Sequence, residues 1–113
     1  MTVLQLTKED LANASIDTML MEYNLSLKEI FELTTYTPET AYAEVVAQFY
    51  SMRSLLRVAN RYGDVEEANF YAAKIMEVDN DWFEATKGKM PLDTVETDDP
   101  VIFQKAIEIL ENS

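Results

Sequence analysis

Carboxylates are the candidate chemical groups in this chain, because its 113 residues include no histidine and no cysteine. Catalysis would therefore fall to Asp, Glu, Lys, Tyr, Ser or Thr. The best-spaced pair is Glu29-x-x-Glu32, where a separation of three puts both carboxylates on one face of a helix. Two such groups could hold a divalent cation. The alternative is an ordinary solvated helix face.

This pair resembles the Glu-x-x-Glu motif of the all-α nucleotide pyrophosphohydrolases, which hold magnesium with that motif and a later Glu-x-x-Asp. The later motif is incomplete here, since Glu77 is followed three residues on by Asn80 and Asp81 lies one residue too far. The solvated face is therefore favoured. We expect a non-enzymatic protein with no catalytic residue, cofactor or metal, and keep a metal-dependent phosphohydrolase as an alternative.

A second acidic motif, Asp79-x-Asp81, begins like an EF-hand calcium loop. Phe83 then stands where position five needs an oxygen ligand, and Met90 where position twelve needs the closing glutamate. These acids are better explained as helix caps.

The charge balance favours a binding protein. The net charge is −12, from 21 acids and nine bases. Residues 1–50 hold eight acids and two bases, residues 51–75 three acids and four bases, and residues 76–113 ten acids and three bases. Such a field repels nucleic-acid phosphates and anionic membranes, and it attracts basic protein surfaces. The alternative is that the acidity serves solubility alone.

Spacing and composition predict an all-α fold. With only two glycines and three prolines, the chain has little room for the turns of a β fold. Thr37-Pro38 begins a long helix over residues 38–62, and Gly63-Asp64 separates it from a second helix over residues 65–78. We expect a single compact domain over residues 1–113, a bundle of five or six helices around this antiparallel hairpin.

The remaining elements are shorter. Residues 1–6 are expected to form a loose arm, followed by one helix from Thr7 to near Asn24 and a second from Ser26 to Leu33. Asp79-Asn80-Asp81 predicts a break before a short helix over residues 82–85. Residues 88–98 are expected to be an acidic loop, and Asp99-Pro100 to begin the last helix.

Residues 26–45 resemble a DNA-binding helix-turn-helix. Its apolar positions are matched by Ile30, Leu33, Tyr36, Ala41 and Val45. The usual small residue and turn glycine are replaced by Phe31 and Thr35. The surface that would meet DNA has no Arg or Lys, and consists of Glu39, Thr40, Tyr42, Ala43 and Glu44. We therefore expect no direct nucleic-acid binding, with a degenerate helix-turn-helix protein as an alternative.

Residues 55–79 resemble the middle of a tetratricopeptide repeat, with Leu55-Leu56 ending one helix and Tyr71 and Ile75 continuing the next. The family's small residue beside the leucine is Leu56 here, and its proline is Asn80. One repeat is visible, whereas a repeat solenoid needs about three. The resemblance implies a helical hairpin.

Three arginines, Arg53, Arg57 and Arg61, are spaced by four and so line one flank of the long helix. They could grip a phosphate or an acidic partner, but we favour pairing with carboxylates such as Glu66 and Glu67. Most aromatics have core spacing, namely Tyr42, Phe49, Tyr50, Phe70 and Tyr71. Trp82 and Phe83 are adjacent, so both are not expected to be buried in one face.

These observations lead us to expect a small acidic adaptor or inhibitor that docks on a basic protein surface. A sharper form is a nucleic-acid mimic, of the type that phages encode, which occupies a nucleic-acid-binding enzyme. An oligomeric assembly component of virion or packaging type is the alternative, so a homo-oligomer is open. Partner contacts are assigned to Asp10, Asp17, Glu22, Glu29, Glu32, Glu39, Glu44, Trp82, Phe83, Asp93, Glu96 and Asp98.

The expected location is the cytoplasm. Residues 1–10 have neither the basic start nor the apolar stretch of a signal peptide. No run of about 18 apolar residues is available for a membrane span.

Overall fold

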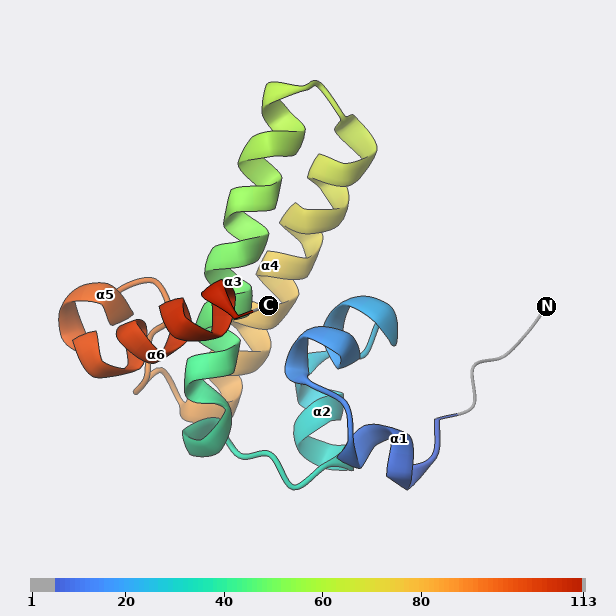
Figure 1. The fold of residues 1–113 in the computed structure, drawn as a ribbon, viewed down its shortest axis with the longest axis vertical. Helices are drawn as coiled ribbons and strands as arrows, with labels where there is room; N and C mark the ends of the chain where they lie inside the picture. Colours follow the sequence, from blue (N-terminus) through green and yellow to red (C-terminus); the bar gives the residue numbers. More distant parts are fainter. Residues whose placement is uncertain (1–5, 113) are drawn as a thin grey trace.

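The computed structural model describes residues 6–112, and within them every regular element is a helix, which confirms the all-α prediction. Six α-helices and one π-helical segment follow one another in this part of the chain (Figure 1). Residues 1–5 of the expected N-terminal arm lie outside the described residues. Within the described part, no helix combines the length and the apolar composition needed to cross a bilayer.

The prediction of one helix from Thr7 to near Asn24 is wrong. The chain forms α1 (Lys8–Ala12), breaks over residues 13–15, and becomes helical again up to the π-helical segment η1 (Thr18–Glu22). Ser15 explains the break, because its Oγ accepts a hydrogen bond from the Thr18 N–H at 3.1 Å and so caps the second piece. Asn24 then turns the chain with a left-handed φ of 53°.

Local capping fixes the next two helices where the sequence predicted them. Ser26 and Glu29 form a reciprocal capping box at the start of α2 (Leu27–Leu33). Thr37 and Thr40 do the same for α3 (Pro38–Arg61), which carries its proline in the first turn. Gly63 ends the turn after α3 with a φ of 71°, a left-handed conformation that glycine adopts without a steric penalty.

The predicted break at Asp79-Asn80-Asp81 is wrong, because α4 (Val65–Thr86) runs unbroken through these residues. Asp and Asn cost at most about 0.7 kcal/mol each in a helix interior, relative to alanine. Continuing the helix keeps Trp82 buried in line with Val78, and losing a buried aromatic costs about 3–5 kcal/mol. Tertiary burial therefore outweighs local propensity. The helix stops after Thr86, where Lys87 (φ 54°) and Gly88 (φ 73°) adopt left-handed conformations.

The predicted acidic loop over residues 88–98 is more ordered than expected. It buries Leu92 and Val95 and contains the short helix α5 (Val95–Asp98). Asp99 caps α6 (Pro100–Glu111) by accepting a hydrogen bond from the Ile102 N–H at 3.1 Å, so the last helix begins where the sequence predicted.

The core lies at the base of the hairpin formed by α3 and α4 (Figure 1). The segment from α1 to α2 lies on one side of this base, with α2 against α4, and α5 and α6 lie on the other, with α6 across α3. The fully buried large side chains are Ile16, Met19, Leu20, Leu27, Ile30, Val45, Val46, Met52, Val78, Trp82, Leu92 and Val95. Of the predicted core aromatics, Tyr42 and Phe49 are buried, Tyr50 and Tyr71 are half-buried, and Phe70 is exposed.

Candidate functional site

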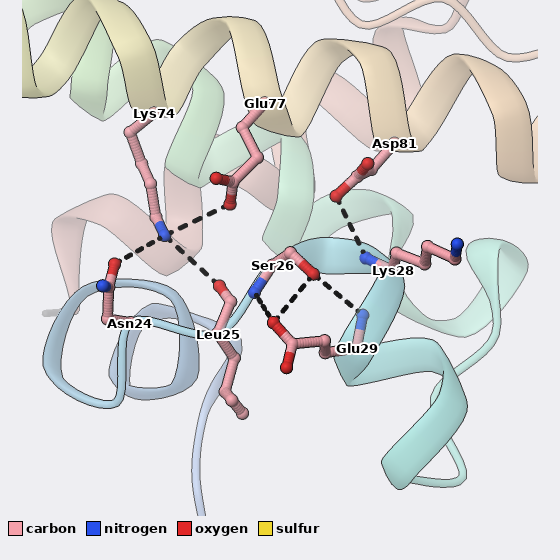
Figure 2. Close-up of polar contacts among 8 residues, drawn as sticks. All are labelled: Asn24, Leu25, Ser26, Lys28, Glu29, Lys74, Glu77 and Asp81. Carbon is pink, nitrogen blue, oxygen red and sulfur yellow. Dashed lines mark hydrogen bonds and ion pairs between the residues drawn. The ribbon is translucent and has the colours of Figure 1, made fainter.

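Two of the candidate carboxylates hold helix starts as well as facing solvent. Asp10 Oδ2 accepts the Thr7 N–H at 3.0 Å, and Glu29 Oε1 accepts the Ser26 N–H and the Ser26 hydroxyl, each at 3.0 Å (Figure 2). These bonds favour the ionised forms. The pKa of Asp10 is lowered mainly by the hydrogen bond from the Thr7 backbone N–H. The pKa of Glu29 is lowered mainly by the hydrogen bond from the Ser26 backbone N–H.

Asp17 and Glu44 line the same surface hollow although they lie far apart in sequence. Both line an open hollow of 730 Å³ together with Tyr36, and Glu44 also accepts the Ile16 N–H at 3.4 Å. Partial burial, and secondarily the charge of Glu44, raises the pKa of Tyr36. Both effects disfavour the ionised form of the Tyr36 phenol.

Three other N-terminal acids are exposed and have no hydrogen-bond or ion-pair partner among the described residues. Glu22 lies in η1 and Glu39 in the first turn of α3. Glu32 lines a second hollow, of 660 Å³, beside Lys8 and Tyr36. Neutralising these three carboxylates should therefore disturb the fold less than neutralising Asp10 or Glu29.

The aromatic pair divides as the spacing predicted. Trp82 is 2% exposed, stacks on Tyr42 with ring centroids 5.4 Å apart, and donates its indole N–H to the Met90 carbonyl. Phe83 is 64% exposed and lines a 350 Å³ hollow that also contains Asp93. Phe83 is therefore the member of the pair that is open to a partner.

The acidic loop is held against α3 by two tyrosines. Tyr42 donates its hydroxyl to the Pro91 carbonyl at 3.3 Å, and Tyr50 donates to the Asp93 carbonyl at 3.4 Å. Burial raises the pKa of both phenols, and nearby carboxylates add to the effect, while the charge of Arg53 lowers the pKa of Tyr50 in part. The side chains of Asp93, Glu96 and Asp98 remain exposed.

The expected pairing of the arginine stripe with Glu66 and Glu67 is wrong. Arg53 instead places its guanidinium over the rings of Phe49 and Tyr50, at 5.5 and 5.7 Å from their centroids, while Arg57 and Arg61 are exposed. The one ion pair between side chains in residues 6–112 is Lys74–Glu77, at 3.3 Å.

Sequence reasoning missed the role of Lys74, which is buried. Its Nζ donates to Asn24 Oδ1 at 3.2 Å, to the Leu25 carbonyl at 3.3 Å and to Glu77 Oε1 (Figure 2). Its spacing was an available signal, since Lys74, Val78 and Trp82 lie four residues apart on the face of α4 that is buried. Nearby, Asp81 accepts the Lys28 N–H at 3.2 Å.

The acids do not gather into a metal centre. Within the described residues, no three or more Asp or Glu side chains come close enough together to hold a metal ion. Of the surface expected to meet DNA in a helix-turn-helix, Tyr42 is buried and Ala43 and Glu44 are half-buried, which leaves Glu39 and Thr40 exposed.

Comparison with protein-family models, with curated proteins and with solved structures found no match to this chain.

Proposed function

We propose that this protein is a non-enzymatic acidic binding protein that docks on a basic surface of another protein. The observation that carries the proposal is that most of its acidic side chains are exposed and lack a cationic partner, with Lys74–Glu77 as the one ion pair in the described part. Because little of the negative charge is neutralised internally, the field acts on the surroundings and steers a basic partner.

The contact surface is proposed to combine charge with one aromatic side chain. The N-terminal acids Glu22, Glu32 and Glu39 would attract the partner, and Phe83 beside Asp93 would anchor it. Exposed rim charges mainly raise the association rate, whereas a buried aromatic anchor slows dissociation. In the sharper form of this proposal, the carboxylates stand in for nucleic-acid phosphates on the partner.

The experiment is affinity capture of the tagged full chain from extracts of the cells that make it, at about 0.1 M and about 1 M salt. The Debye length falls from about 10 Å to about 3 Å between these conditions. We expect a basic protein to be captured at low salt and released at high salt. A partner that stays bound at about 1 M salt contradicts docking by charge. Release of the captured protein by added DNA would support the mimic in particular.

A further inference from the structure

The far end of the hairpin projects beyond the rest of the fold (Figure 1). We call residues 54–72 the arm. Beyond Met52, α3 buries only Ala59, and α4 buries no side chain before Lys74. The two helices of the arm therefore cover each other while their outer surfaces stay open.

Apolar side chains concentrate on this arm. Leu55, Val58 and Tyr62 are 40%, 48% and 79% exposed, and their spacing of three and four places them on one face of α3. Val65 and Phe70 are exposed on α4. Scattered exposed apolar residues need no explanation, but a concentration of them marks an interaction surface.

Residues 51–73, which include the arm, are also the part of the chain where acids do not outnumber bases. Residues 51–63 contain three arginines and no acid, whereas residues 64–73 contain three acids and no base. The arm thus carries positive charge on α3 and negative charge on α4, at the same end of the hairpin. Arg57 and Arg61 make no ion pair with Glu66 or Glu67 of their own chain.

We propose that the arm binds the arm of a second copy of this chain. A two-fold interface needs a surface that is complementary to itself. An arm that lies with its α4 along α3 of the first copy puts its acids against Arg57 and Arg61, and the symmetry repeats the pairing. The result is a four-helix bundle that covers the exposed apolar side chains of both arms.

Electrostatics favours the arms as the place where two copies would meet. Two molecules of charge −12 repel each other wherever residues 1–50 or 76–113 meet, because both segments are strongly acidic. Contact through the arms avoids bringing these segments into the interface. The inference uses residues outside the proposed docking surface and does not rest on the proposed function.

The test is the mass of the full chain in solution, by sedimentation equilibrium at about 0.15 M salt, where the Debye length is about 8 Å. The protein concentration is raised to about 1 mM, where an interface worth only about 4 kcal/mol is already well populated. We expect the mass to rise from 13.0 kDa towards twice that value. A mass that stays monomeric throughout overturns the proposal.

Variants that reverse the charges of the arm test whether it is the surface where the two copies meet. We expect R57E/R61E to be monomeric, since it leaves the arm wholly acidic, and an equimolar mixture with E66R/E67R to restore a species of double mass. V58S should also weaken the dimer, whereas V101S, which removes a still more exposed valine from α6, should leave the mass unchanged. Association that is insensitive to R57E/R61E and V58S contradicts the arm as the interface. Circular dichroism of each variant checks that its helices are intact.

Discussion

Lys74 Nζ lies 3.3 Å from the carbonyl oxygen of Leu25, and this contact fastens the turn before α2 to the middle of α4 (Figure 2). The same ammonium donates a hydrogen bond to the side-chain oxygen of Asn24, whose left-handed backbone turns the chain between η1 and α2. One buried cation therefore joins the N-terminal segment to the hairpin.

Replacing this lysine should destabilise the fold. In K74A the Leu25 carbonyl and the Asn24 amide lose their charged donor, and a hydrogen bond to a charged group contributes about 1.5–3 kcal/mol. We expect the free energy of unfolding, measured by urea titration, to fall by about 1–3 kcal/mol. K89A, which removes an exposed lysine, should stay within about 0.5 kcal/mol of the unaltered protein. Equal urea midpoints for the two variants would show that the buried contacts contribute nothing.

The two neighbouring aromatics should separate stability from binding. W82A empties a buried site between Tyr42 and Phe31, so we expect a loss of about 3–5 kcal/mol in unfolding free energy. F83A removes an exposed ring and should change stability by no more than about 0.5 kcal/mol.

F83A is expected to affect partner binding although it leaves stability nearly unchanged. Once a partner has been captured, F83A should raise its dissociation rate, because aromatic anchors act mainly on dissociation. Surface plasmon resonance measures this rate directly. An unchanged rate would remove Phe83 from the proposed contact.

Acid should weaken the helix start at α2. Hydrogen bonds from Ser26 lower the pKa of Glu29 below its ordinary value of 4.5, so the stabilisation is complete above that value and is lost as the pH falls through the folded-state pKa. Protonation of the many other acids relieves repulsion and acts in the opposite direction. The difference between the unaltered protein and E29Q therefore isolates the effect.

We expect E29Q to be less stable than the unaltered protein at neutral pH, and the two urea midpoints to converge as the pH falls below 4.5 and through the folded-state pKa of Glu29. E32Q is the matched control, because Glu32 lies one turn later and accepts no hydrogen bond in the described part. A difference that persists unchanged through the acid range would rule out the capping contribution.

Features that depend on neighbouring residues were predictable from the sequence. Thr37-Pro38 and Asp99-Pro100 both begin helices where expected, because a cap and a first-turn proline act within four residues. The continuation of α4 through Asp79–Asp81 was not predictable in this way, since it depends on the burial of Trp82 against Tyr42 and Phe31.

The acidic character of the candidate surface was predictable from the sequence, but the position of its residues in the fold was not. Composition indicates excess acid, yet the placing of Asp17 and Glu44 around one hollow requires the fold of α3 against the N-terminal segment. The exposure of Phe70 was missed for a similar reason. Helical spacing gives it a face but does not say whether any other element covers that face.

The most direct test of charge-steered docking compares two triple variants that lose the same charge. E22Q/E32Q/E39Q neutralises N-terminal acids whose side chains have no hydrogen-bond or ion-pair partner in the described part, and E84Q/E108Q/E111Q neutralises exposed acids elsewhere. Capture of the basic partner is measured for both at about 0.1 M salt, where the Debye length is about 10 Å. We expect the first variant to lose the partner and the second to retain it. Equal retention by both would contradict docking through the N-terminal acids.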